Sequence, residues 1–400
     1  MTVVAMSTLG TSPYTEVTYR FASGEAVKSS YPIHALMKRA GIKFDQTIVL
    51  LTDEARRQNW ELLHLYLTEA KAAGVVRDIS IKDGRKEDEL WEIFQAITDA
   101  VPEKAELYID ITHGLRHLPM LLVMACAYLR VAKEVQIKSI SYGAFELGDR
   151  EVINGRSTVV ACDVFDILPF VTLFDWANAT SAFQRAGDAS FLADLLRKTG
   201  TGLPTEGKAE VEKVAQRLDN VTLALDLARP DEAMIEAQIL TQELNTSAQQ
   251  VQRYAKPFGL LKGLIERTFQ RISLPEARTN SVADRLRKQR DLIYWYMERG
   301  RVALASLIAR EWFISDYMQK HRITPINDYE SREGAGNLLS RRPDRNARPM
   351  DARWYRIWRE LRLRDVRNEI AHAGQSEDQP MTAAEIKKTV EEIVKEIKQM

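Results

Sequence analysis

The order in which strand-like and helix-like segments follow one another is the strongest constraint on the fold of this chain. Up to about residue 165 the two kinds alternate, and two strand-like runs, IVLLT from Ile48 and LYIDIT from Leu107, are almost continuously apolar. Strands that helices cover on both faces have such sequences. The alternation therefore predicts βαβ units and a mainly parallel sheet, which together make an α/β fold.

The strands and helices of this first part are predicted from the spacing of apolar residues and from the glycines and prolines between segments. Strands are predicted at residues 3–7, 15–21, 47–52, 75–81, 105–111, 136–145 and 157–163. Helices are predicted between them at residues 33–40, 53–73, 86–100 and 118–132. The last two strands have no helix between them, so we expect an antiparallel hairpin at one edge of the sheet, with its turn near residues 148–155.

After about Leu168 the strand signals disappear and the pattern is all-α. Helices are predicted at residues 174–186, 190–198, 206–228, 231–254, 281–299, 302–318, 351–366 and 383–399. Residues 329–350 are rich in Arg, Gly, Asn and Pro, and are predicted to form a long flexible loop. A chain of 400 residues is long enough for two or three domains, which we expect at 1–168, 169–280 and 281–400.

Charge and cysteine content narrow the class of protein. The 56 Lys and Arg residues balance the 56 Asp and Glu residues, which excludes a globally basic nucleic-acid binder but leaves room for a local basic site. The two cysteines exclude a disulfide scaffold and a Cys-rich zinc module, and they suit a reducing cytoplasm. The first residues lack the basic stretch of a signal peptide, and the longest apolar run, 118–129, is too short to span a bilayer. We therefore expect a cytoplasmic protein without a membrane partner.

Polar residues follow two of the predicted strands. After the first strand come Gly10, Thr11 and Ser12, and the later strand runs into the segment DITHGLR, which contains Asp110, Thr112, His113, Gly114 and Arg116. In open α/β sheets ligands bind at the carboxyl ends of strands, and a following helix N-terminus offers unpaired N–H groups to phosphate. These loops predict a nucleotide or phosphate ligand. Alternatively, Asp110 and Thr112 only cap the next helix.

A metal site is not expected in this segment. His113 and His117 are four residues apart and could share a helix face, but no matching set of carboxylates or cysteines accompanies them.

A second polar cluster lies near the C-terminus, in the segment RNEIAHAG, which contains Arg367, Asn368 and His372. Asn368 and His372 are four residues apart and so share one face of a helix. An imidazole can move a proton near neutral pH, and a guanidinium can stabilise charge on a phosphorane. The set therefore suits metal-free cleavage of RNA, in which the ribose 2′-OH attacks its own phosphate. The alternative is an Arg-rich solvated helix with a His at its C-terminal end.

Both clusters resemble known families. DITHGLRHLP, the first loop followed by EVTYRF, and ISIKDGRKEDELWEIF are similar to the CARF sensor domain of CRISPR-associated proteins. RNEIAHAG resembles the HEPN ribonuclease box, and two upstream helical segments, FDWANATSAFQRAGDASFLADLL and DLIYWYMERGRVALASLIAREWFISDY, resemble those of CARF–HEPN effectors. The resemblance implies a Rossmann-like CARF domain followed by an all-α HEPN domain.

The resemblance also implies roles for residues and partners. A ligand-binding role falls on Gly10, Thr11, Ser12, Asp110, Thr112, His113, Gly114 and Arg116, to which topology adds Thr52, and a catalytic role on Arg367, Asn368 and His372. The expected protein is a homodimer or higher oligomer of a type III CRISPR system. It would cleave single-stranded RNA without a metal or other cofactor when activated by a cyclic oligoadenylate, with cyclic tetra-adenylate favoured.

Two other functions remain open at this stage. The sensor could itself degrade the cyclic oligoadenylate as a ring nuclease, for which Thr11, Thr112 and His113 are suitably placed. The chain could also be a ligand-responsive regulator that binds nucleic acid without cleaving it.

Overall fold

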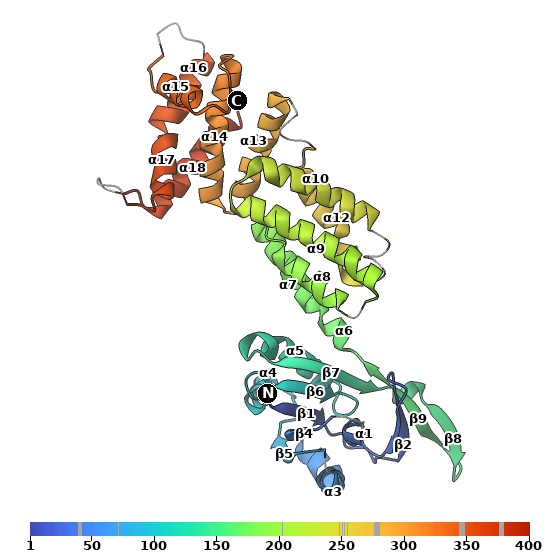
Figure 1. The fold of residues 1–400 in the computed structure, drawn as a ribbon. Helices are drawn as coiled ribbons and strands as arrows, with labels where there is room; N and C mark the ends of the chain where they lie inside the picture. Colours follow the sequence, from blue (N-terminus) through green and yellow to red (C-terminus); the bar gives the residue numbers. More distant parts are fainter. Residues whose placement is uncertain are drawn as a thin grey trace. The chain divides into compact units, whose positions relative to one another are not determined.

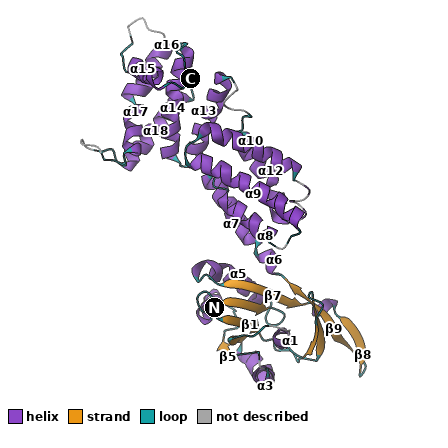
Figure 2. Cartoon of the chain, in the orientation of Figure 1, coloured by secondary structure: helices purple, strands orange, loops and turns teal. Residues whose placement is uncertain are grey.

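The computed structural model describes residues 1–400 except 39–41, 71, 202, 248, 250, 252, 254, 276–280, 344–348 and 376–379. The chain divides into two compact units, Met1–Phe174 and Asp175–Met400. Strands gather in the first unit, and the second is built of helices (Figure 2). The predicted α/β region and the helical remainder are both confirmed.

The first unit is built on one sheet, in which β7, β6, β1, β4 and β5 are neighbours in that order and run parallel, with β5 at the edge. The strands are β1 Val3–Thr8, β2 Val17–Phe21, β3 Ala26–Ser29, β4 Gln46–Leu51, β5 Val75–Ser80, β6 Glu106–Asp110, β7 Gln136–Gly143, β8 Asp149–Ile153 and β9 Arg156–Asp166. The helical segments are α1 Pro32–Lys38, α2 Asp53–Ala55, the π-helical η1 Arg56–Trp60, α3 Glu61–Glu69, α4 Glu87–Ala100, α5 His117–Ala132, the 3₁₀-helical η2 Phe145–Leu147 and α6 Leu168–Val171.

Helices cover both faces of this sheet, with α4 and α5 on one side and α1 and α3 on the other (Figure 1). Along β4 the buried side chains alternate between the two cores: Ile48 and Leu50 pack on the α4–α5 side, and Val49 and Leu51 on the α1–α3 side. This two-sided burial explains why the IVLLT run is continuously apolar.

The two strands of the expected hairpin, β7 and β9, pair antiparallel, but β9 does not lie at an edge of the sheet, and most of the predicted turn forms a further strand, β8, which was not predicted. β8 and β9 pair antiparallel around a turn at Asn154 and Gly155, which have positive φ values of 51° and 77°. β9 also pairs in parallel with β2 and antiparallel with β7, so it is an interior strand. The edge prediction is wrong because β2 and β3 extend the sheet beyond β9.

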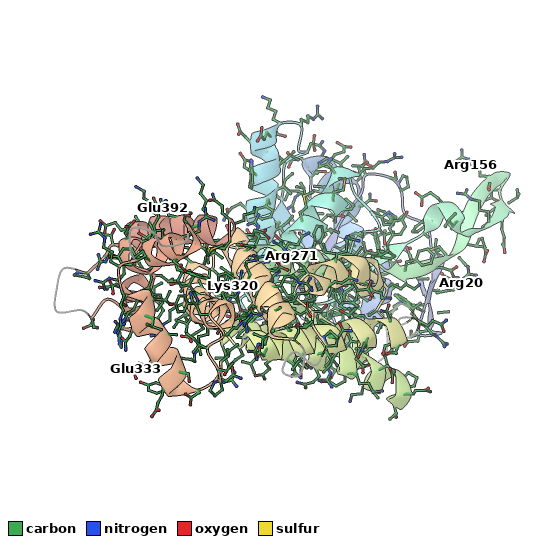
Figure 3. The ribbon with its side chains drawn as sticks, turned by 90° about the horizontal axis from the view of Figure 1, so that it is seen from above. Arg20, Arg156, Arg271, Lys320, Glu333 and Glu392 are labelled. Carbon is green, nitrogen blue, oxygen red and sulfur yellow. The ribbon has the colours of Figure 1, made fainter. Side chains whose placement is uncertain are left out.

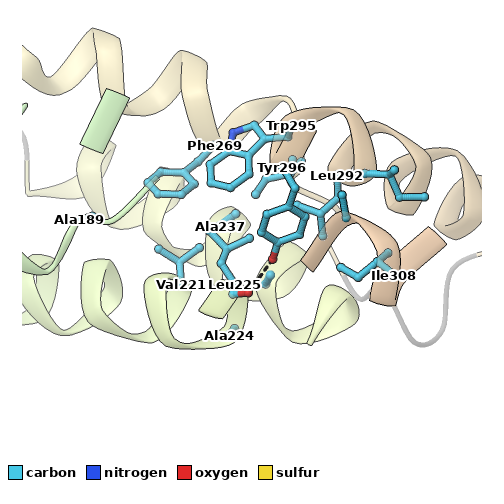
Figure 4. Close-up of a cluster of buried hydrophobic side chains, with 14 of the residues drawn as sticks. Ala189, Val221, Ala224, Leu225, Ala237, Phe269, Leu292, Trp295, Tyr296 and Ile308 are labelled. Atoms are coloured by element: carbon cyan, nitrogen blue, oxygen red, sulfur yellow. Dashed lines mark hydrogen bonds between the residues drawn. The ribbon is translucent and has the colours of Figure 1, made fainter. Parts of the chain in front are cut away.

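The second unit is made of helices around one continuous apolar core. They are α7 Leu173–Ala186, α8 Ser190–Gly200, α9 Thr205–Asp226, α10 Pro230–Thr246, α12 Lys256–Gln270, α13 Val282–Glu298, α14 Val302–Lys320, α15 Tyr329–Leu339, α16 Pro349–Tyr355, the π-helical η3 Arg356–Glu360, α17 Leu363–Ala371 and α18 Ala383–Ile397. Part of the core surrounds Trp295 and Tyr296, where the Tyr296 hydroxyl donates a 2.6 Å hydrogen bond to the carbonyl oxygen of Leu225 (Figure 4).

Three parts of this unit differ from the sequence prediction. The helix predicted at residues 351–366 is α16 continued by η3, and α17 begins as a separate helix at Leu363 after Arg362, which has a positive φ of 56°. α12 was not predicted, although its Pro257 lies in the first turn, where proline is compatible with a helix, and it buries Phe258, Ile265 and Phe269. The loop predicted at residues 329–350 contains α15, which Asp328 caps by accepting a hydrogen bond from the Ser331 N–H. Burial of side chains on one face outweighs the low helix propensity of the glycines.

Charged side chains of this unit project from the helices, as Glu333 of α15 and Glu392 of α18 illustrate (Figure 3). Among the described residues, no helix is both long and apolar enough to cross a membrane.

Candidate functional site

The carboxyl ends of β1, β4 and β6 lie next to one another, because β1 pairs in parallel with both other strands. The strand order turns at this point, which is where open α/β sheets bind ligands. A cavity of about 200 Å³ opens here. Its lining includes Gly10, Thr11, Ser12, Thr52, Thr112, His113 and Gly114. The fold thus brings most of the predicted ligand-binding residues together.

Asp110 lies beneath this cavity and does not line it. The residue is only 1% exposed, and its carboxylate accepts hydrogen bonds from the Ser7 hydroxyl at 2.7 Å, the Thr112 N–H at 3.1 Å and the Thr112 hydroxyl at 2.5 Å. Burial raises the pKa of the Asp110 carboxyl, and the hydrogen bonds from Thr112 and Ser7 oppose part of that shift. Asp110 therefore shapes the loop from below.

The Thr112 hydroxyl is already engaged with protein groups. Besides donating to Asp110, it accepts a 2.9 Å hydrogen bond from the backbone N–H of Gly143 in β7. Neither Asp110 nor Thr112 caps α5, since that helix begins at His117 with Arg116 as its N-cap and has no side-chain cap. The two residues join the loop to β1 and β7, which differs from the capping alternative.

Gly114 allows the loop after β6 to approach β1 closely. Its φ of +118° is a conformation that side chains rarely adopt, and an added Cβ would lie 2.8 Å from Thr8 Oγ1. The Thr8 hydroxyl donates a hydrogen bond to the carbonyl oxygen of His113. This contact ties the end of β1 directly to the His113–Gly114 turn.

Two residues that sequence reasoning missed hold the loop after β1. The Asn59 side-chain amide donates to the carbonyl oxygens of Gly10 at 2.9 Å and Ser12 at 3.0 Å. The Tyr14 hydroxyl accepts a 2.8 Å hydrogen bond from the Gly10 N–H. The position of Tyr14 two residues after Ser12 was a usable signal, whereas nothing local to Asn59 indicates its role.

His113 presents a neutral imidazole at the cavity. Its ring packs edge-on against Tyr14, with centroids 4.6 Å apart, and lies 5.1 Å from Phe145. Burial lowers the pKa of His113 to about 4. Its Nε2 is buried and has no hydrogen-bond partner among the residues that the structure describes. A ligand in the cavity is therefore a suitable partner for this nitrogen.

The remaining predicted residue, Arg116, is exposed and lines neither this cavity nor the larger one beside it. The larger cavity, of about 870 Å³, shares Thr11, Thr52 and Leu115 with the first and continues along the ends of β4 and β5 to α4. Basic and acidic side chains line it together: Arg57, Lys82, Arg85, Asp53, Glu54, Asp83, Glu89 and Glu92.

The second candidate site lies at the C-terminal end of α17. Leu363 and Val366 anchor this helix in the core, and positive φ values at Ala373 and Gly374 end it. His372 is exposed there, one turn after Asn368, whose carbonyl oxygen accepts a 2.8 Å hydrogen bond from the His372 N–H.

The surroundings of Arg367 differ from those of the exposed His372. Its guanidinium donates a 3.4 Å hydrogen bond to the Asn368 side chain and lines a cavity of about 330 Å³ whose lining does not include His372. One chain thus places the arginine next to Asn368 and exposes the histidine separately. Within the described part of the chain, no three His, Cys, Asp or Glu side chains are close enough to hold a metal ion.

Comparison with known proteins identifies the family. Residues 4–146 match the CARF domain of the CRISPR system endoribonuclease Csx1, and residues 172–274 match the second domain of the CRISPR-associated protein MJ1674. The chain is 26% identical over 214 residues to CRISPR-associated protein MJ1674 of Methanocaldococcus jannaschii, a match that covers 52% of this chain and 30% of that protein. The chain thus matches less than a third of that relative's length. These matches support a CRISPR-associated protein of the CARF family, whose first unit is similar to the CARF domain of Csx1.

Proposed function

We propose that this CARF protein is an endoribonuclease that cleaves single-stranded RNA without a metal ion when a cyclic oligoadenylate binds its first unit. The observation that carries the proposal is the group formed by Arg367, Asn368 and the exposed His372 at the end of α17. An exposed histidine, a guanidinium and an amide within one short helix are a suitable set for phosphodiester cleavage once two chains bring them together.

In the proposed reaction the ribose 2′-oxygen attacks the adjacent phosphorus and the bond to the 5′-oxygen breaks. His372 accepts the 2′-OH proton or donates a proton to the leaving oxygen. The Arg367 guanidinium stabilises negative charge on the phosphorane, and Asn368 orients its neighbours. One imidazole cannot serve both oxygens at once, so we propose that two chains complete the site.

A second copy of this chain would suit the exposed face of α5. Met120, Met124, Tyr128 and Val131 follow one another at helical spacing and are 62%, 55%, 52% and 81% exposed. Because α5 begins directly after the DITHGLR loop, a copy packed there around a two-fold axis would bring two ligand-binding loops together. One cyclic ligand could then contact both chains.

We propose that the ligand acts by shifting a population. The ring can favour an active arrangement of the two α17 helices only through its different affinity for the two states. The engaged hydroxyl of Thr112 counts against a role in cutting the ring, so the ring-nuclease alternative gains no support from that residue.

The test is a cleavage assay with fluorescent single-stranded RNA, a panel of cyclic oligoadenylates, and EDTA present or absent. We expect cleavage with a cyclic ligand, cyclic tetra-adenylate foremost, and no effect of EDTA. RNA that binds but stays intact with every ring would favour the regulator alternative. Activity abolished by EDTA would contradict the metal-free mechanism.

A further inference from the structure

The cavity that Arg367 lines is rich in charged side chains. It is bounded by the turn between α9 and α10 and by α13, α14, α15 and α17, and it measures about 330 Å³. Its charged lining consists of Arg285, Arg332, Arg367, Asp231 and Glu311. The lining thus holds three arginines and two acidic residues, with Gln289, Ser315 and Asn327 among its other polar residues.

The guanidinium of Arg332 is hydrogen-bonded to several acceptors of the protein itself. It donates to the Ser315 hydroxyl at 2.8 Å, the Ile326 carbonyl oxygen at 3.0 Å and the Glu311 carboxylate at 2.7 Å. Arg310 also pairs with Glu311. The negative charge of Glu311 is therefore neutralised by two arginines, and this group forms one wall of the cavity.

Arg285 and Arg367 are less well hydrogen-bonded than Arg332. The Nε of each is buried and has no hydrogen-bond partner within the described residues. The ion pair of Arg285 with Asp231 is long, at 3.8 Å, while the other Asp231 oxygen accepts a 2.9 Å hydrogen bond from Gln289. A buried charged donor without an acceptor is costly. These two guanidiniums therefore favour an anion with several oxygens.

We infer that this cavity binds a phosphodiester of single-stranded RNA, with Arg285 as a phosphate-binding residue. The inference rests on the proposed function, in which Arg367 contacts the cleaved phosphate. Because Arg367 belongs both to the RNEIAHAG segment and to the lining of the cavity, we expect a strand whose phosphate contacts Arg367 to reach the cavity. The forked donors of arginine match phosphate geometry, and such a contact is independent of base sequence.

The experiment measures RNA affinity by fluorescence anisotropy at 50–200 mM salt, with His372→Ala in every protein to prevent cleavage. Arg285→Gln should weaken binding about tenfold for RNAs of different sequence and reduce the slope of log K against log salt by about 0.7. Arg285→Lys should keep the slope and bind roughly threefold more weakly, because it keeps the charge and loses the fork. Arg287→Gln is the control, since Arg287 is on the same helix, 62% exposed and paired with Asp284.

Unchanged affinity and slope in folded Arg285→Gln would overturn the inference. If Arg285→Gln does not fold, unchanged affinity in Arg285→Lys would do so. A third arm adds inorganic phosphate alone: if phosphate raises the melting temperature through Arg285 but RNA does not compete with it, the cavity holds a free anion and the RNA assignment is wrong. The two claims fail separately. If Arg285 contributes to RNA binding but the protein with His372 intact cleaves no RNA with any cyclic oligoadenylate, the proposed function is contradicted and the phosphate site stands.

Discussion

The two candidate sites of this protein are built in opposite ways. In the CARF domain the buried Ser7 and Asp110 are hydrogen-bonded to each other, and Asp110 is also bonded to the half-buried Thr112, so these groups hold the cavity in one shape. At the end of α17, His372 is exposed and held through its backbone. The first arrangement suits a preformed binding site, because few groups must be ordered when a ligand arrives. The second suits a site that a partner chain completes.

The largest expected difference between the two sites is the loss of RNA cleavage when His372 is replaced. If its imidazole carries protons in the reaction, His372→Ala should lower the rate of RNA cleavage by about 10²–10⁴ and leave activator affinity unchanged. A matched control is His321→Ala, since both histidines follow the last residue of a helix in the same unit. Cleavage that persists in His372→Ala would contradict the assignment, as would equal losses in both variants.

The next prediction tests whether the exposed site needs two chains. Heterodimers of wild type with an Arg367→Ala/His372→Ala chain should cleave far more slowly than half the wild-type rate per dimer, because each complete site would draw on both subunits. The rate is measured on tagged, separately purified heterodimers, with a tagged wild-type dimer as control. Half of the wild-type activity would mean that each chain holds an independent site.

In the CARF domain the sharpest variant is Gly114→Ala. It places a Cβ 2.8 Å from Thr8 Oγ1 at a φ of +118°, which should cost about 1–3 kcal/mol and lower activator affinity more than tenfold. Calorimetry with cyclic tetra-adenylate measures this affinity. The control is Gly155→Ala, where φ is +77° and nothing lies within 4 Å, so that strain arises far from the cavity. Equal losses of affinity in the two variants would show that the effect is general destabilisation.

Acid should weaken the CARF domain through its buried histidines. Burial lowers the pKa of both His34 and His113 to about 4. The unfolded chain takes up these protons near pH 6.5, so the stabilisation is present above that pH and is lost as the pH falls from 6.5 towards 4. Each imidazole contributes about 2 kcal/mol to the difference between pH 7 and pH 5, so the change in the free energy of unfolding over this range should be about 4 kcal/mol larger in wild type than in His34→Asn/His113→Asn, as urea unfolding at the two pH values measures. An equal difference in both proteins would contradict the role of these imidazoles.

The smallest expected effect is on the free energy of unfolding when one buried tyrosine in each unit is replaced by phenylalanine. The Tyr296 hydroxyl donates to the Leu225 carbonyl, so Tyr296→Phe should cost about 1 kcal/mol in the free energy of unfolding. The Tyr19 hydroxyl is buried and has no hydrogen-bond partner among the described residues, so Tyr19→Phe should be nearly neutral or stabilising. Thermal unfolding of the two variants measures this, and a larger loss in Tyr19→Phe would reverse the comparison.

The sequence by itself determined the class of each unit and most of the first site. Apolar runs such as IVLLT predicted buried parallel strands, and parallel strands bring their carboxyl ends to one edge, so Gly10, Thr52 and His113 converge from separate segments. The composition of DITHGLR did not show that Asp110 would lie under the cavity and Arg116 outside it. Asp110 is the last residue of β6 and Arg116 is the N-cap of α5, so the place of each depends on how the loop between them packs on β1 and β7.

Only the tertiary structure decided the features that depend on distant partners. Asn59 holds Gly10 from 49 positions away, β9 becomes an interior strand because β2 pairs with it, and α15 is helical where the local sequence favours a loop. Arg285 and Arg367 face one cavity from helices far apart in the chain. Periodicity reports which face of an element is buried, since that is a local property. Which atoms contact that buried face depends on packing against distant segments, and a local sequence pattern does not contain this information.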